Sequence, residues 1–191
     1  MDPVDRAIRA IDAANAADPG VVEGEPLALV EGRLADGWLE RLSDDPSDAL
    51  RLAARAHHLR RWVVPRSSYP DGRAGYLRWR RDQKSRHATE LTAILDDAGV
   101  ESEIAERAAV IVTKAGLGTD PEVQVFEDAV CLTFLRTQLS STADRLDDDH
   151  MVRVIAKTLA KMSDRATQLA SEVPMDEHAT ALLARAVAES A

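Results

Sequence analysis

Apolar residues recur along almost the whole chain at intervals of three and four positions, and no stretch alternates convincingly between apolar and polar residues. A period near 3.6 residues is typical of an amphipathic α-helix, whereas a half-buried strand has a period of two. Clusters that contain proline interrupt the pattern at residues 18–20, 44–46 and 70–72. The sequence therefore predicts an all-α fold of about seven or eight helices, formed as a single domain over residues 1–191.

These interruptions place the expected helices along the chain. The stretches with helical periodicity cover residues 3–16, 26–42, 47–62, 73–95, 101–115, 121–135, 147–171 and 175–189. In the second of them, the expected buried face consists of Leu27, Val30, Leu34, Trp38 and Leu42. Asp120 and Pro121 form the cap and first-turn pair that is typical of a helix start.

The composition narrows the class of protein. Cys131 is the only cysteine, so an intrachain disulfide is excluded, and its apolar neighbours favour a buried thiol in a reducing cytosol. No apolar run approaches the ~20 residues that span a bilayer, and the start lacks the apolar segment of a signal peptide. The net charge of −9 argues against general nucleic-acid binding. We expect a cytoplasmic protein with neither a membrane nor nucleic acid as its partner.

One segment differs sharply in charge from the rest. Residues 51–86, which we call the basic island, contain ten arginines and one lysine against two acids, a formal charge of +9. The rest of the chain carries −18, and four of the seven aromatic residues lie in the island. This concentration favours a local site for an anionic small molecule. The candidate anion-binding residues are Arg55, Arg61, Arg66, Tyr69, Arg73, Tyr76, Arg80 and, outside the island, Lys114.

Histidines and a pair of acids lie in or near predicted helices. On a helix, the adjacent His57 and His58 would point about 100° apart, so both are not expected to face one site. Glu127 and Asp128 are embedded in the apolar stretch VQVFEDAVCLTFL. Buried acids are costly unless they are paired, hydrogen-bonded or metal-bound. A structural ion pair between helices and a metal ligand (Asp128) beside an acid–base group (Glu127) both fit this pattern.

Four segments together are similar to a known family. The stretches are AARAHHLRRWVVPRSSYPDGRAGYLRWR, RHATELTAILDDAG, VQVFEDAVCLTFL and KTLAKMS. They resemble an all-helical family of domains of unknown function, whose members are sometimes labelled glutamyl-tRNA synthetase. The KMS triplet lies within a predicted helix and lacks a His-Ile-Gly-His partner, so it does not indicate a synthetase. At the positions of His57 and His58 the family has glutamine followed by histidine. The resemblance therefore implies a functional role for His58, the histidine that matches the family.

A second resemblance is to the HD-domain superfamily of metal-dependent phosphohydrolases. These helical enzymes take their metal ligands from an early histidine, an adjacent His-Asp pair and a late aspartate. The order His58, His87, Asp128 is similar to that layout and implies a divalent metal ion held by these three residues. The chain departs from the pattern because Ala88 follows His87, so the His-Asp pair is absent.

Three interpretations follow. The first is a metal-dependent hydrolase of a nucleotide or another phosphorylated small molecule, in which Glu127 is the general base and arginines hold the phosphate. The second is a non-catalytic anion- or nucleotide-binding module that uses the arginines and aromatic residues of the island. In the third, the arginines only bridge acids on neighbouring helices. Convergence of Arg66, Arg73 and Arg80 on an open pocket would favour a ligand site.

Overall fold

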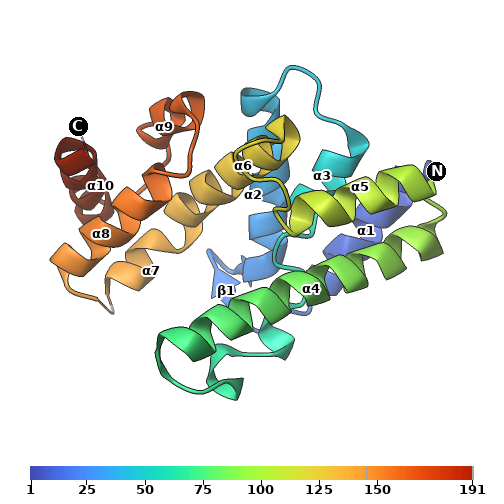
Figure 1. The fold of residues 1–191 in the computed structure, drawn as a ribbon, viewed down its shortest axis with the longest axis horizontal. Coiled ribbons are helices and arrows are strands. Elements are labelled where there is room, and N and C mark those ends of the chain that lie inside the picture. Colours follow the sequence, from blue (N-terminus) through green and yellow to red (C-terminus); the bar gives the residue numbers. More distant parts are fainter. Residues whose placement is uncertain (145, 191) are drawn as a thin grey trace.

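The computed structural model describes residues 1–144 and 146–190, and it confirms the all-α fold (Figure 1). The described part contains α-helices, two short 3-10 turns and one hairpin of two-residue strands. In chain order the elements are α1 (Pro3–Asn15), β1 (Val21–Val22), β2 (Glu25–Pro26), α2 (Leu27–Leu42), α3 (Asp48–Arg55), η1 (Arg61–Val63), η2 (Arg66–Ser68), α4 (Gly72–Ala98), α5 (Ser102–Val112), α6 (Pro121–Thr137), α7 (Leu139–Ala143), α8 (Asp148–Leu159), α9 (Asp164–Ala170) and α10 (Glu177–Ser190).

Polar side chains fix the starts of several helices. An Asp or Ser side chain precedes the first turn and accepts a hydrogen bond from a backbone N–H that has no partner within the helix. The residues that cap α1, α3, α6, α8 and α9 in this way are Asp2, Ser47, Asp120, Asp147 and Ser163. These caps therefore mark half of the ten α-helix starts in the described residues, and the sequence predicted all of these except the start of α9.

The described structure has more helices than the seven or eight expected. The predicted helix over residues 147–171 is two helices, α8 and α9, separated by a turn that precedes Ser163. The predicted helix over residues 47–62 ends at Arg55, and the chain continues in turns. The hairpin of β1 and β2 was not expected, because two-residue strands are too short to show an alternating pattern.

Two hydrophobic clusters form the core, one at each end of the molecule. Helices α1 to α6 supply the first cluster and α6 to α10 supply the second. Trp38 and Leu42 of α2 pack against both, so α2 and α6 connect the two ends, while the termini lie at opposite ends of the long axis (Figure 1). No helix in the described residues combines the length and apolar character needed to cross a bilayer.

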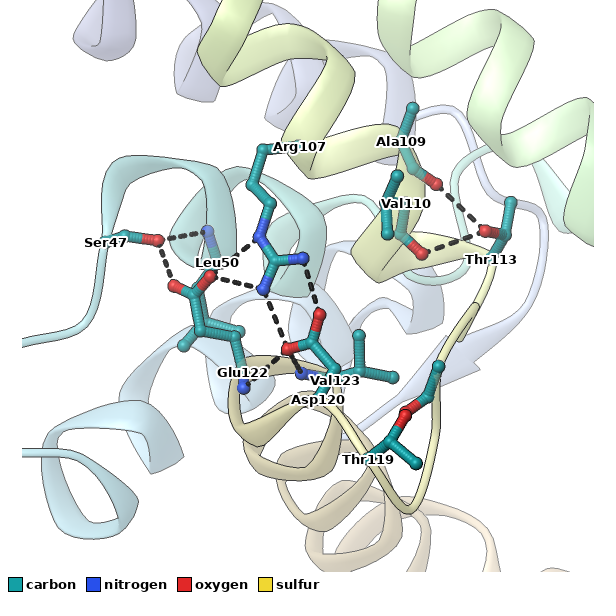
Figure 2. A network of polar contacts seen from close by, with 11 residues as sticks. Ser47, Leu50, Arg107, Ala109, Val110, Thr113, Thr119, Asp120, Glu122 and Val123 are labelled. Carbon is teal, nitrogen blue, oxygen red and sulfur yellow. Dashed lines mark hydrogen bonds and ion pairs between the residues drawn. The ribbon is translucent and has the colours of Figure 1, made fainter.

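A closed network of charges ties the start of α6 to α5 and α3 (Figure 2). The Arg107 guanidinium donates to Asp120 Oδ2 at 2.6 Å and Oδ1 at 2.8 Å, and to Glu122 Oε2 at 2.8 Å. The Ser47 hydroxyl donates to the other oxygen of Glu122. Asp120 also caps α6, and the Arg107 hydrogen bonds hold the pKa of its carboxyl down to about 2. The network is therefore part of the scaffold.

A glycine sets the distance between α2 and α3. A Cβ atom on Gly32 would lie 2.5 Å from the carbonyl oxygen of Arg55, the last residue of α3. Only a residue without a side chain permits this approach. It brings the chain that follows Arg55 against the part of α2 that contains Glu31.

Candidate functional site

A cavity of about 250 Å³ lies between α2, the turns that follow α3, and α4. Its walls combine two acids, one histidine and one arginine with apolar and aromatic side chains. The lining residues are Asp18, Leu27, Glu31, His58, Arg61, Trp62, Pro65, Trp79 and Gln138. The basic island therefore contributes five of the nine residues that line this cavity.

The two adjacent histidines lie in turns and not in a helix. Because α3 ends at Arg55, residues 56–60 form consecutive turns, and Arg60 takes a left-handed conformation with φ of 48°. The ring centroids of His57 and His58 are 4.2 Å apart. The prediction that the pair would point about 100° apart was wrong, since it assumed that the helix continues to Trp62.

Glu31 and His58 form a buried carboxylate–imidazole pair. His58 Nδ1 lies 2.5 Å from Glu31 Oε2. The other carboxylate oxygen accepts hydrogen bonds from the Thr137 hydroxyl, at 3.0 Å, and from the Gln138 amide. Glu31 is 1% exposed, so its charge is stabilised by these donors and not by water. The contact fixes the ring of His58 and leaves Nε2 as its free nitrogen.

His57 is held in the same way by the backbone. Its Nδ1 lies 3.2 Å from the carbonyl oxygen of Ala54, an acceptor, so Nδ1 carries the proton and Nε2 is left unprotonated. Burial, reinforced by the neighbouring His58, lowers the pKa of His57 to about 3. Burial also lowers the pKa of His58 well below its usual range, with Arg61 and Lys114 as further causes. Both rings are therefore neutral near pH 7.

His87 of α4 lies beside this pair. Its ring centroid is 6.4 Å from that of His58, and the residue is 4% exposed. Within the described part of the chain, His87 Nε2 is buried and has no hydrogen-bond partner. Burial, followed by His58 and Arg61, lowers the pKa of His87 to about 2. A buried imidazole nitrogen without a hydrogen-bond partner is unusual, so His87 is a candidate functional residue of α4.

The structure brings together a group of candidate metal ligands that differs from the predicted one. In the described residues, ligand atoms of Glu31, His57 and His58 all lie within 4.8 Å of one another. His87 and Asp128 do not belong to this group. Asp128 accepts hydrogen bonds from Ser163 N at 2.9 Å, Ser163 Oγ at 2.6 Å and the Gln124 amide at 2.9 Å. Its carboxylate therefore joins α6 to the start of α9, as the structural interpretation of a buried acid requires.

Glu127 lies outside the cavity lining. Its carboxylate forms ion pairs with Lys114 and, at 3.8 Å, with Lys161. Burial alone would raise its pKa, but the nearby cations, Lys114 first, lower the pKa on balance. An ionised glutamate shared by two lysines is a poor general base. Glu127 and Lys114 thus form an ion pair outside the cavity lining, although Lys114 is close enough to help lower the pKa of His57 and His58.

Arg61 is the only arginine of the basic island in the cavity wall. Its guanidinium carbon lies 4.5 Å from the centroid of the Trp79 ring, and no carboxylate among the described residues forms an ion pair with it. Burial lowers the pKa of Arg61 from its usual range. Its backbone is anchored because Gln83 donates to the Arg61 carbonyl at 3.0 Å. A partly buried arginine without a carboxylate partner is suited to an anionic ligand.

Two candidates of the island have internal partners. Arg55 donates to Asp12 through two hydrogen bonds of 2.7 Å and to Asp36 at 3.1 Å. Arg66 donates to backbone carbonyls, among them that of Tyr69 at 2.9 Å. Both arginines stabilise the scaffold.

The remaining candidates also lie away from the cavity lining. The Tyr69 hydroxyl donates to Asp82 at 2.9 Å. Arg73, Tyr76 and Arg80 are exposed on α4. Arg66, Arg73 and Arg80 therefore do not converge on the cavity, and Arg61 is the candidate arginine that lines it.

Sequence reasoning missed Glu31, His57, Trp79 and Gln138. Glu31 had a recognisable signal, because it shares a helix face with Ala28 and Ala35 at steps of three and four. The face predicted for α2 was displaced, since the fully buried residues include Ala35 and Leu39 instead of Leu34 and Trp38. Gln138 lies over a hundred residues from Glu31, and no local pattern indicates their contact.

The protein is thus an all-α domain in which the Glu31–His58 pair lies in the same cavity as Arg61. The chain belongs to the family described as Domain of unknown function (DUF4202), whose model matches residues 5–183. No curated protein and no solved structure matches the sequence.

Proposed function

We propose that the cavity is the active site of a metal-dependent hydrolase that acts on a nucleotide or another phosphorylated small molecule. One observation carries the proposal: Glu31, His57 and His58 place ligand atoms within 4.8 Å of one another beside a cavity that contains Arg61. The contact of His58 Nδ1 with a carboxylate and that of His57 Nδ1 with a carbonyl oxygen are the usual supports of metal-binding histidines.

The donor set fits a divalent transition metal such as zinc or manganese. Neutral imidazoles are good ligands for such ions, and both histidines have pKa values well below neutrality. Nε2 of His57 and Nε2 of His58 would hold the ion, and Glu31 would orient His58 through Nδ1. The ion would supply a bound water of lowered pKa as the nucleophile. Of the three ligands expected from the HD resemblance, only His58 belongs to this group, which contains neither His87 nor Asp128.

The walls of the cavity provide for the substrate. Arg61 would hold a phosphate oxygen through its planar guanidinium, and the low polarity around Trp62 and Trp79 would strengthen that contact. Because Arg61 is packed over the Trp79 ring, its side chain is preorganised. The apolar rings would also accept the organic part of the substrate.

A non-catalytic anion-binding module is the second candidate. It is favoured by the hydrogen bonds that Glu31 already makes with Thr137, Gln138 and His58, which an ion would have to share. Under this alternative, Arg61 and the two tryptophans alone define the ligand. The two candidates differ in whether the protein binds metal and releases phosphate.

The test uses protein purified without a histidine tag. Its metal content is measured, and phosphate release is assayed with p-nitrophenyl phosphate and a panel of nucleotides and sugar phosphates, with added Mn²⁺ or Zn²⁺ and with chelator. We expect stoichiometric metal and chelator-sensitive hydrolysis. His58→Ala should lower the rate by about 100-fold or more and remove the metal.

His178→Ala is the matched control, since His178 is exposed and pairs with Asp148 on the surface. It should leave metal content and rate unchanged. Wild-type protein that binds no metal and releases no phosphate, but is stabilised by a phosphorylated compound, would support the binding module instead. Hydrolysis that survives in His58→Ala at the wild-type rate would overturn the assignment of the active site.

A further inference from the structure

A second group of charged side chains gathers around Glu127, and none of its members lines the cavity. Lys114 follows α5, Lys161 follows α8, and both form ion pairs with the Glu127 carboxylate of α6. Glu127 and Lys114 are largely buried, with side-chain exposures of 5% and 17%, whereas that of Lys161 is 44%. Three separate parts of the chain therefore bring charge to one place.

Helix α4 adds two more cations to the group. Arg80 and Lys84 are one turn apart, so they lie on the same face of the helix. The pKa of Lys84 is lowered by partial burial and then by Lys114, Arg80 and Lys161, and Arg80 and Lys161 also act on Glu127. These effects fall off with distance, so they place Arg80 and Lys84 close to the ion-paired lysines.

The charges in this group do not balance. Four cations surround one carboxylate, and among the described residues neither Arg80 nor Lys84 has an acid within ion-pair distance. The nearby Cys131 thiol does not change this, because burial and Glu127 raise its pKa to about 12 and keep it neutral. Lys114 also has a left-handed backbone with φ of 59°, a strained conformation for a lysine. The protein thus holds excess positive charge at a fixed position.

We propose that a diphosphate-type anion binds to a site formed by Arg80, Lys84, Lys114 and Lys161. Glu127 would hold Lys114 and Lys161 in position between its two ion pairs. A diphosphate carries more negative charge than inorganic phosphate, so it matches the surplus of cations more closely. Lysines and arginine are the usual ligands of phosphate oxygens. The exposed side of Lys161 and Arg80 gives the anion access from solvent. The site does not require the cavity to be catalytic.

Titration calorimetry of the full chain with pyrophosphate and with inorganic phosphate tests the proposal. We expect pyrophosphate to bind more tightly than phosphate, and both to bind more weakly as salt rises. Lys84→Met should weaken pyrophosphate binding about tenfold, and Lys161→Met, at a more exposed position, about threefold. Glu127→Gln should strengthen binding, because it removes the competing negative charge.

Lys157→Met is the matched control. Lys157 is exposed on α8, one turn before Lys161, and should leave the affinity unchanged. Equal weakening by Lys157→Met and Lys84→Met would show a diffuse charge effect and overturn the site, as would absence of pyrophosphate binding to the wild type. Weaker binding in Glu127→Gln would also overturn it, provided that thermal unfolding shows a folded variant.

The failure of this proposal can be separated from the failure of the hydrolase. His58→Ala should lower hydrolysis about 100-fold or more and leave pyrophosphate affinity within about twofold, because the hydrogen bond described for His58 goes to Glu31 and the neutral ring carries no charge. Lys84→Met should weaken pyrophosphate binding and retain hydrolysis of p-nitrophenyl phosphate. Joint loss of both properties in both variants would show one continuous site and refute the separation proposed here.

Discussion

The Arg107 network and the histidine cavity both bring charged side chains from distant helices together, but they differ in how completely those groups are paired. In the network, the guanidinium of Arg107 lies between Asp120 and Glu122, and Ser47 donates to the remaining oxygen (Figure 2). In the cavity, Arg61 has no carboxylate partner among the described residues. Polar groups with all their partners stabilise a fold, whereas unpaired groups held in place are available to a ligand.

The largest effect on the cavity is expected from a substitution that separates α2 from α3. A Cβ atom in Gly32→Ala would lie 2.5 Å from the Arg55 carbonyl oxygen, and backbone atoms cannot move aside cheaply. We expect a loss of roughly 2–3 kcal/mol in the free energy of unfolding, with weakened metal binding because the histidine turn shifts relative to Glu31. Chemical denaturation and metal analysis measure the two effects.

Gly37→Ala provides the control on the same helix. Nothing lies within 4 Å of a Cβ atom at Gly37, so alanine should stabilise the protein by up to about 1 kcal/mol through its higher helix propensity. If both substitutions proved neutral, the close approach of α2 and α3 would not be what positions the site.

Two arginines six residues apart test the difference between paired and unpaired charge. Arg55→Met removes the partner of Asp12 and Asp36, and the side chains of all three are less than a quarter exposed. We expect it to cost about 2–3 kcal/mol of stability, because it leaves Asp12 without an ion-pair partner, while Asp36 keeps Arg51 at 3.4 Å. Denaturant unfolding at pH 7 measures this loss.

Arg61→Met should show the opposite profile. Without a carboxylate partner to strand, it should change stability by less than about 0.5 kcal/mol and raise the KM for p-nitrophenyl phosphate about tenfold. A large stability loss in Arg61→Met with an unchanged KM would mean that this arginine belongs to the scaffold.

The network itself offers a smaller effect, confined to stability. Asp120→Ala removes the side chain that caps α6, which accepts from Glu122 N at 3.0 Å and Val123 N at 3.3 Å. Loss of such a cap costs about 1–2 kcal/mol, so the denaturation midpoint should fall while hydrolysis and metal content stay unchanged. A variant that loses metal would show that the two regions are coupled and not independent.

Local sequence was sufficient for most of the fold. The helical period and caps such as Asp120 and Ser47 act within a few residues, so these helix starts could be predicted without tertiary information. The split between α8 and α9 could not, because it depends on Asp128, which is 35 residues from the Ser163 that it binds. Asp128 was correctly expected to be buried, but its partner was not visible in the sequence.

The site was less predictable than the fold, for two physical reasons. The end of α3 at Arg55 turns an expected helix into a tight turn, and this places His57 beside His58. Glu31 was overlooked because its helix face consists of small residues, which the search for large apolar side chains passed over. The basic island supplies five of the nine residues that line the cavity, including Arg61, although most of its arginines have other roles.

The two regions are also expected to differ in how their contribution to stability depends on pH. The pKa values of His57 and His87 lie at about 3 and about 2, well below the usual value of about 6.5 for an unfolded chain. Below pH 6.5 these histidines are therefore protonated in the unfolded chain but remain neutral in the folded protein. Stability contributed by these groups is complete above pH 6.5 and is lost by up to about 1.4 kcal/mol per pH unit for each histidine.

The Arg107 network responds in a lower window. The pKa of Asp120 is depressed to about 2 from a usual 3.8, so its contribution persists down to about pH 4 and is lost only below that. Denaturation measured from pH 7 to pH 4.5 should thus report mainly the buried histidines and not Asp120. His87→Gln should reduce the slope in this range, because glutamine does not titrate, while the exposed His178→Gln should leave it nearly unchanged. An unchanged slope in His87→Gln would mean that this ring accepts a proton in the folded protein, and the buried Nε2 without a partner would then need an acceptor that forms only at low pH.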